Sequence, residues 1–134
     1  MARAVKTFSF PWDAGFRYSQ AMRVGDLVFV SGQAAIDEAG NVVGEGDFLA
    51  QADQVFANLR AALEASGSGL DRVVKVGIYV TDMSHFPQVV ERRGRYFTEP
   101  YPADTIVQVD ALALPGLMLE IEAVATAAGA AEPE

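Results

Sequence analysis

The sequence contains no cysteine and only one histidine among its 134 residues. The lack of cysteine excludes disulfides, zinc sites with thiolate ligands, iron–sulfur clusters and cysteine nucleophiles. A single histidine argues against a multi-histidine metal site and against a serine–histidine catalytic triad. We therefore expect no metal site in this protein.

Basic side chains are also scarce, since 10 Lys and Arg stand against 18 Asp and Glu, giving a formal net charge of −8. Phosphate binding needs a surplus of basic residues, so the charge argues against a nucleic-acid partner. No apolar run reaches the roughly 20 residues of a membrane span, and no signal peptide opens the chain. We expect a cytoplasmic protein that does not associate with membranes.

The composition is 51% hydrophobic and 21% charged, which is too apolar for a disordered chain. The length fits one domain. We assign this domain to residues 1–127 and a flexible acidic tail to residues 128–134. The high apolar content indicates that part of the surface is buried against other copies of the chain.

Hydrophobic periodicity predicts an α+β fold with the element order β-β-α-β-α-β-β. The first fifteen residues have no regular pattern. One helix is expected between its N-cap Asp47 and Gly67, and another from Ser84 to about Phe97. The predicted strands cover residues 16–22, 27–33, 73–82, 104–111 and 117–126.

Both helices should cover the same face of the sheet. Alternation along the last strand places Glu120 and Glu122 on the opposite face, and we assign Asp104 and Ile106 to that face as well. This second face is either solvated or packed on another subunit. We favour a subunit because of four large apolar side chains expected there, and a pocket at such an interface would be a natural site. These side chains are Phe29, Tyr79, Ile106 and Met118.

A series of short motifs runs through residues 15–125. They are Tyr18-Ser19-Gln20-Ala21, Val30-Ser31-Gly32-Gln33, Gln54 with Asn58-Leu59, Val74-Lys75, Tyr79-Val80-Thr81-Asp82, Phe97-Thr98-Glu99, Leu114-Pro115 and Glu120-Ile121-Glu122-Ala123. In type and order these motifs resemble the Rid family (RidA/YjgF), the reactive-intermediate deaminases. The resemblance implies a chorismate-mutase-like fold, a homotrimer and clefts between subunits. It also implies a small-molecule substrate: an enamine or imine, such as 2-aminoacrylate, hydrolysed to a keto acid and ammonia without a cofactor.

Four residues match the family's cleft, and the resemblance suggests a role for each. Glu120 would position the attacking water or transfer a proton, and Tyr18 would fix the plane of the substrate. The backbone N–H groups of Ser31 and Gly32 would take a developing negative charge on oxygen. Structural alternatives remain open, because Tyr18 and Glu120 could be subunit contacts and Ser31-Gly32 could simply be a strand end.

Three cleft positions depart from the family. The arginine that binds the substrate carboxylate corresponds to Asp104, which follows Pro102-Ala103. The family's helix asparagine corresponds to Val90, and the cysteine two places after the arginine corresponds to Ile106. A carboxylate repels a carboxylate, so we expect a substrate other than 2-iminopropionate.

Arg93 is the candidate for a replacement cation. In the predicted helix it shares a stripe with Phe86, Val90 and Phe97, and an arginine on an apolar stripe needs an anion or a route to water. It is either a relocated clamp for a substrate carboxylate or the partner of Asp104 in a structural ion pair. Other cationic side chains are weaker candidates, expected at the surface or on another strand face: Arg17, His85, Arg92 and Arg95.

The leading hypothesis is a cofactor-free hydrolytic deaminase of a reactive imine or enamine. The alternative is a trimeric ligand-binding or accessory protein that has kept the fold and lost the chemistry. RNA cleavage has been attached to relatives of this family, but the net charge of −8 argues against it.

Overall fold

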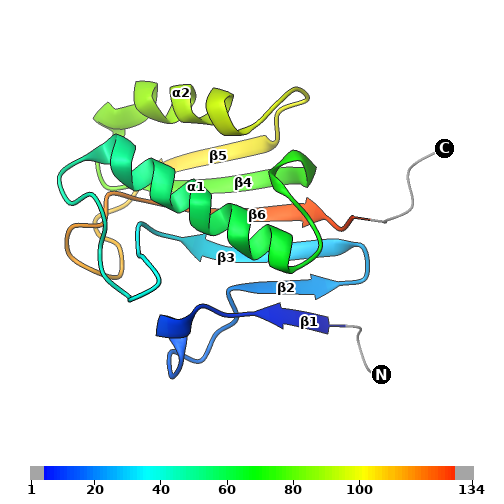
Figure 1. Ribbon diagram of the computed structural model, residues 1–134. Coiled ribbons are helices and arrows are strands. Elements are labelled where there is room, and N and C mark those ends of the chain that lie inside the picture. Colours follow the sequence, from blue (N-terminus) through cyan, green and yellow to red (C-terminus); the bar gives the residue numbers. More distant parts are fainter. Residues whose placement is uncertain (1–4, 129–134) are drawn as a thin grey trace.

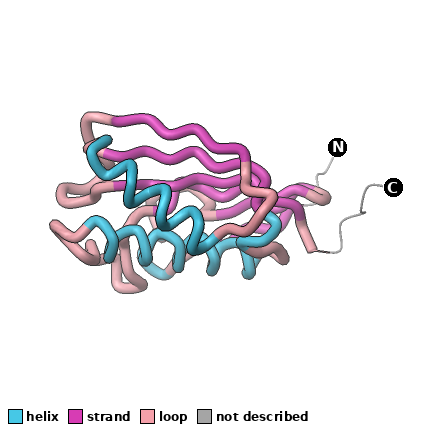
Figure 2. Tube along the Cα trace, turned by 90° about the horizontal axis from the view of Figure 1, so that it is seen from above, coloured by secondary structure: helices cyan, strands magenta, loops and turns pink. Residues whose placement is uncertain are grey.

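The computed structural model describes residues 5–128 and shows one six-stranded sheet with two helices on one face (Figures 1 and 2). The helices are α1 (Phe48–Ala65) and α2 (Phe86–Tyr96). The strands are β1 (Val5–Phe8), β2 (Ala21–Val24), β3 (Leu27–Gln33), β4 (Val73–Val80), β5 (Ala103–Gln108) and β6 (Leu119–Thr126). The predicted α+β class is confirmed. Most of the predicted tail, residues 129–134, lies outside the described residues.

The strand order is β1-β2-β3-β6-β4-β5, and every pair is antiparallel except β4 and β5. This parallel pair is joined by the crossover helix α2. The β3–β6 register shifts, because Val30 pairs with Ala123 whereas Gln33 pairs with Ile121. Ser31 and Gly32 therefore form a β-bulge, a feature that re-aims neighbouring side chains.

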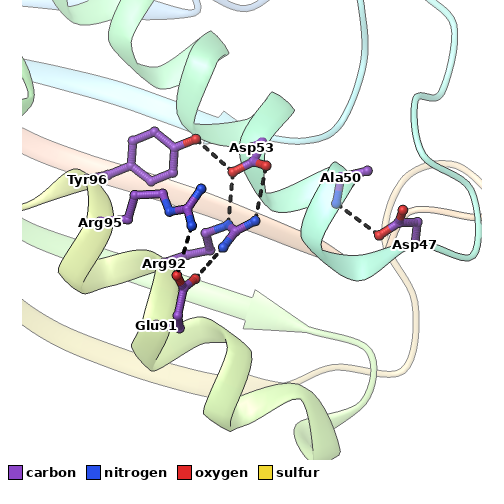
Figure 3. Close-up of polar contacts among 7 residues, drawn as sticks. All are labelled: Asp47, Ala50, Asp53, Glu91, Arg92, Arg95 and Tyr96. Carbon is purple, nitrogen blue, oxygen red and sulfur yellow. Dashed lines mark hydrogen bonds and ion pairs between the residues drawn. The ribbon is translucent and has the colours of Figure 1, made fainter.

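The core lies between the helices and the sheet. Asp47 caps α1 by accepting a hydrogen bond from the Ala50 N–H at 3.1 Å, as Figure 3 shows. Leu119 and Ile121 are each only 1% exposed, which confirms the facing predicted for β6. The apolar stripe of α1 packs onto these strands with side chains that are at most 3% exposed, namely Phe48, Val55, Phe56, Leu59 and Leu63.

The N-terminal prediction was wrong in two respects. Residues expected to be irregular form the edge strand β1 and a 3₁₀ turn at Pro11–Asp13. The strand expected from residue 16 begins only at Ala21, since Arg17 adopts a left-handed φ of 63° that interrupts an extended chain. Tyr18 is therefore on a loop, where its direction is not set by strand alternation.

The predicted facing of β5 was also wrong. Its parallel register places Asp104 beside Val76 and Ile106 beside Ile78, two buried residues of β4. Asp104 and Ile106 thus lie on the helix side. The opposite side, here called the uncovered face, is lined by Lys75, Gly77, Tyr79, Thr105, Val107, Glu122 and Val124. Polar and apolar residues occur on both sides of this edge strand, so their alternation did not indicate which side faces the helices.

Arg92 is buried between the helices rather than solvated as predicted (Figure 3). Its Nε lies 2.9 Å from Oδ1 of Asp53 on α1, and its Nη2 lies 3.2 Å from Oδ2. Tyr96 donates a further hydrogen bond to Asp53 at 2.7 Å. Arg95, whose side chain is 55% exposed, fits the predicted solvated face. The error at Arg92 arose because the carboxylate that permits its burial comes from the other helix.

Neither helix of the described chain has the length and apolarity needed to cross a lipid bilayer. Within residues 5–128, no three His, Asp or Glu side chains gather as a metal site would require.

Candidate functional site

A cavity of about 850 Å³ opens where β3 ends and β6 begins, and we call it the main cavity. Four of the predicted site residues line it together: Tyr18, Ser31, Gly32 and Glu120. They come from the loop before β2, from the β3 bulge and from β6. Residues more than a hundred positions apart in the sequence are therefore collected into one site.

Glu120 lies against the backbone of Gly32. A Cβ atom on Gly32 would be only 2.6 Å from both Cδ and Oε2 of Glu120, so any side chain there would displace the Glu120 carboxyl group. Burial raises the pKa of Glu120, and the negative charge of Glu122 raises it further. A carboxyl group with a raised pKa accepts and returns protons more readily near neutral pH.

Tyr18 presents a protonated hydroxyl group to the cavity. Its Oη accepts a hydrogen bond of 3.0 Å from the Gln20 side-chain amide, so its own proton can be donated to a ligand. Desolvation raises the pKa of Tyr18, and the Asp13 and Glu120 charges raise it too, whereas the Gln20 hydrogen bond lowers it. The phenol is thus held as a neutral donor.

A buried polar network that the sequence did not reveal supports Tyr18. The Gln20 amide also donates to Asp13 Oδ2 at 2.9 Å, and the Gln33 amide donates to Gln20 Oε1 at 2.8 Å. Asp13, Gln20 and Gln33 are all at most 5% exposed. Gln20 and Gln33 stand inside the quoted motifs, but Asp13 lies in the segment that was assigned no structure.

Ser31 has a structural hydrogen-bonding role. Its backbone N–H donates to the Gln20 carbonyl at 2.8 Å, and its hydroxyl donates to the Ser19 carbonyl at 2.6 Å. These bonds hold the loop before β2 against the bulge. Because the Ser31 N–H already has a partner, the hypothesis of an oxyanion site now depends on Gly32.

The loop before β6, which forms part of the main cavity wall, is fixed by Gln51 of α1, a fully buried residue. Its amide donates to the Gly116 carbonyl at 2.7 Å and accepts from the Met118 N–H at 2.8 Å. These bonds hold the loop that carries Leu114 and Leu117, both of which line the cavity. In the sequence Gln51 appeared as one polar residue of a helix, with no sign of its partners.

Three of the remaining candidates, Val90, Arg93 and Asp104, line a second cavity of about 390 Å³. Nε of Arg93 is 3.1 Å from Oδ2 of Asp104. Burial raises the pKa of Asp104, although the Arg93 and Lys75 charges lower it. Of the two interpretations of Arg93, the structure shows the ion pair. Ile106 packs against the core and lines neither cavity.

Two of the weaker cationic candidates are also placed by the structure. The His85 ring stacks on Phe48 with centroids 4.3 Å apart, and it is half-buried rather than a free surface group. Arg17 is exposed and does not line the main cavity. Neither side chain contributes to the site.

Comparison with known proteins gives consistent matches. A family model described as "Endoribonuclease L-PSP" matches residues 11–127. Protein HMF1 of Saccharomyces cerevisiae is 43% identical over 112 residues, covering 84% of this chain and 85% of that protein. A 2-iminobutanoate/2-iminopropanoate deaminase of Dermatophagoides farinae is 37% identical over 92 residues, covering 69% of this chain and 72% of that protein.

Solved structures agree with these matches. The crystal structure of RidA from an Antarctic Psychrobacter superposes with a TM-score of 0.80 at 39% identity, covering 93% of this chain and 99% of that one. The fold, the motifs and the matched range therefore coincide, and the chain belongs to the YjgF/RidA family, also described as endoribonuclease L-PSP.

Proposed function

We propose that this protein is a cofactor-free hydrolytic deaminase, acting on a reactive imine or enamine in the main cavity. The observation that carries the proposal is the joint placement of the Glu120 carboxyl group and the Tyr18 hydroxyl group in this cavity. The relative named as an imine deaminase supports the same reaction class. Imine hydrolysis requires positioned water, a proton carrier and stabilisation of developing charge.

The reaction divides into an addition and an elimination. The Glu120 carboxylate takes a proton from water while the water oxygen bonds to the carbon of the protonated imine, and the C=N π electrons move to nitrogen, which gives a neutral carbinolamine. Glu120 then returns its proton to that nitrogen. The C–N bond breaks, ammonia leaves, and the hydroxyl oxygen loses its proton to Glu120 as the carbonyl forms. Tyr18 holds the substrate plane by donating a hydrogen bond.

We further propose that the protein works as a homotrimer in the cytoplasm. The uncovered face carries a shallow depression of about 300 Å³, and Phe29 is 45% exposed. A neighbouring chain packed there would bring its second cavity beside the main cavity. The site would then hold Glu120 and Tyr18 from one subunit and the Arg93–Asp104 pair from the next.

The usual 2-iminopropionate is a poor candidate substrate for this site. The lining of the main cavity includes no Lys, Arg or His among the described residues. Arg93 is already paired with Asp104, so its charge is offset within the second cavity. An anionic substrate would therefore meet the Glu120 carboxyl group without a free cation to hold it.

The test is to generate imines in situ, with amino-acid and amine oxidases, and to measure how fast each one disappears with and without this protein. We expect acceleration for at least one imine, and a loss of about 10²-fold or more in the Glu120→Gln variant. Glu64→Gln is the matched control, because Glu64 is exposed on α1. If no imine is hydrolysed faster, the proposed function is wrong.

The competing candidate is a ligand-binding or accessory protein without catalysis, and the Arg93–Asp104 pair is the observation that favours it. Such a protein would bind ligands in the main cavity yet leave imine hydrolysis at the spontaneous rate. Glu120→Gln would then change binding only.

A further inference from the structure

Three aromatic side chains from the segment before β2 form one wall of the main cavity: Trp12, Phe16 and Tyr18. The family resemblance assigns a role only to Tyr18. Phe16 is 68% exposed and Tyr18 is 44% exposed, so both are available to a ligand. The segment lies at the same end of the molecule as the loop preceding β6 (Figure 1).

Trp12 is held firmly within this wall. Its ring stacks on Phe10 with centroids 6.2 Å apart and planes inclined by 7°, and it meets Phe16 edge-on at 6.2 Å. A Cβ atom on Gly40 would lie 3.1 Å from Cβ of Trp12, so the loop backbone at Gly40 passes close beside it. An aromatic surface that is positioned before a ligand arrives binds at low entropic cost.

Within residues 5–128, the charged side chains that line the main cavity are only negative. Glu120 is the one carboxyl group in the lining, and the described residues there include no basic side chain. Aromatic faces attract cations through the ring quadrupole. The wall and the carboxyl group therefore favour the same kind of ligand.

The size of the cavity points to a ligand larger than a three-carbon imino acid. Its volume of about 850 Å³ lies within the range of roughly 300–1,000 Å³ that is usual for sites of drug-sized molecules. Leu114 and Leu117, on the loop anchored by Gln51, line the same cavity as the aromatic wall and add apolar surface to it. The cavity thus offers both aromatic and aliphatic surface to an aromatic ring.

We propose that the main cavity binds an aryl-substituted cation without a carboxylate, namely the iminium form of an arylalkyl imine, with its nitrogen beside Glu120 and its ring against Trp12 and Phe16. The inference rests on the proposed function, since the iminium is the species that would be hydrolysed. It adds the substrate class, and it makes Trp12 and Phe16 specificity-determining residues.

Binding can be measured without turnover, because Trp12 is the only tryptophan in the chain. The experiment is a titration of Trp12 fluorescence in the full-length protein, checked by calorimetry, with three stable probes. These are 2-phenylethylammonium, 2-cyclohexylethylammonium and 3-phenylpropionate, which separate the contribution of the aromatic ring from that of the positive charge. We expect 2-phenylethylammonium to bind most tightly and 3-phenylpropionate most weakly.

Variants of Phe16 and Glu120 test which residue gives the preference for the aromatic ring and which gives the preference for the positive charge. Phe16→Ala should weaken 2-phenylethylammonium binding by about three- to tenfold, and Phe16→Leu should reduce the preference over the cyclohexyl probe. Glu120→Gln should remove most of the preference for the cation over 3-phenylpropionate. Equal or tighter binding of 3-phenylpropionate to the unmodified protein, or unchanged binding in Phe16→Ala, overturns the inference.

These outcomes are distinguishable from failure of the proposed function. Tight aryl-cation binding without imine hydrolysis would support the ligand class and contradict the deaminase. Hydrolysis of small imino acids together with weak aryl-cation binding would support the deaminase and contradict the ligand class.

Discussion

The Glu120 carboxyl group rests on Gly32 so closely that a Cβ atom there would lie 2.6 Å from its Cδ. The contact exists because the β3 bulge places the Gly32 backbone under the β6 side chain. Gly32 is therefore required by the position of its neighbour, and it is not among the glycines that have a left-handed φ.

Gly32→Ala should displace Glu120 and lower imine hydrolysis by about 10²-fold, since a misplacement of about 1 Å can cost that much. Stability should change little, because the displaced group is the end of a flexible side chain. Gly69→Ala is the control, as its Cβ would meet only the side chain of the exposed Asp71, with Oδ1 at 2.8 Å. Undiminished activity in Gly32→Ala would show that the Gly32–Glu120 contact does not position the catalytic group.

Glu122→Gln should move the acidic limb of the pH–rate profile to lower pH. The Glu122 charge helps to raise the pKa of Glu120, so its removal lowers that pKa and keeps the Glu120 carboxylate available in more acidic solution. Tyr79→Phe is the control, because Tyr79 only donates a hydrogen bond to Glu122 and its loss leaves the charge in place. The pH dependence of kcat/KM measures the effect, and an unmoved limb in Glu122→Gln would exclude Glu120 as the titrating base.

Glu120→Gln should make the protein more stable at neutral pH. A carboxyl group whose pKa is raised in the folded state destabilises the fold increasingly as the pH rises above its unfolded pKa, and fully above its folded pKa, because the unfolded chain ionises more readily. The penalty vanishes below the unfolded pKa, so the two proteins should converge at about pH 4. Urea denaturation at both pH values gives the free energies of unfolding, and a less stable variant at neutral pH would contradict the expected burial cost.

Asp53→Ala should reduce the free energy of unfolding by about 2 kcal/mol, because the buried Arg92 would lose both hydrogen bonds to Asp53 and keep only its ion pair with Glu91. The exposed Arg95–Glu91 pair supplies the comparison, and Arg95→Ala should cost less than about 1 kcal/mol. Thermal and urea unfolding would measure both changes. Equal losses of unfolding free energy in the two variants would mean that the burial of Arg92 does not strengthen its ion pair with Asp53.

The success of the sequence predictions depended on how local their signals were. The α1 cap at Asp47 and the alternation in β6 are local, and both predictions were confirmed. The facing of Asp104 and the burial of Arg92 depend on a parallel register and on a carboxylate of another helix, which no local pattern contains.

In the candidate site, too, the residues that belong to local motifs could be predicted, and those that depend on contacts made by the fold could not. The family motifs identified Tyr18, Gly32 and Glu120, which the fold gathers in one cavity. Trp12 of the aromatic wall and Asp13 of the Asp13–Gln20–Gln33 network come from a segment with no periodicity, so only the three-dimensional structure revealed their part in the site.

The Arg93–Asp104 pair offers the most direct test of the proposed site. In Asp104→Ala the Arg93 guanidinium loses its partner but stays near solvent, since its side chain is 26% exposed, so the fold should survive. In the proposed cleft between subunits, a freed cation would bind a substrate carboxylate. We expect kcat/KM for 2-iminopropionate to rise by about ten- to a hundredfold, as hydrogen bonds to charged groups contribute about 1.5–3 kcal/mol. The double variant Asp104→Ala with Arg93→Ala should lose this gain, and kcat/KM for an uncharged imine should not change in either. A gain that persists without Arg93, or no gain at all, would contradict the placement of the second cavity beside the main cavity of a neighbouring subunit.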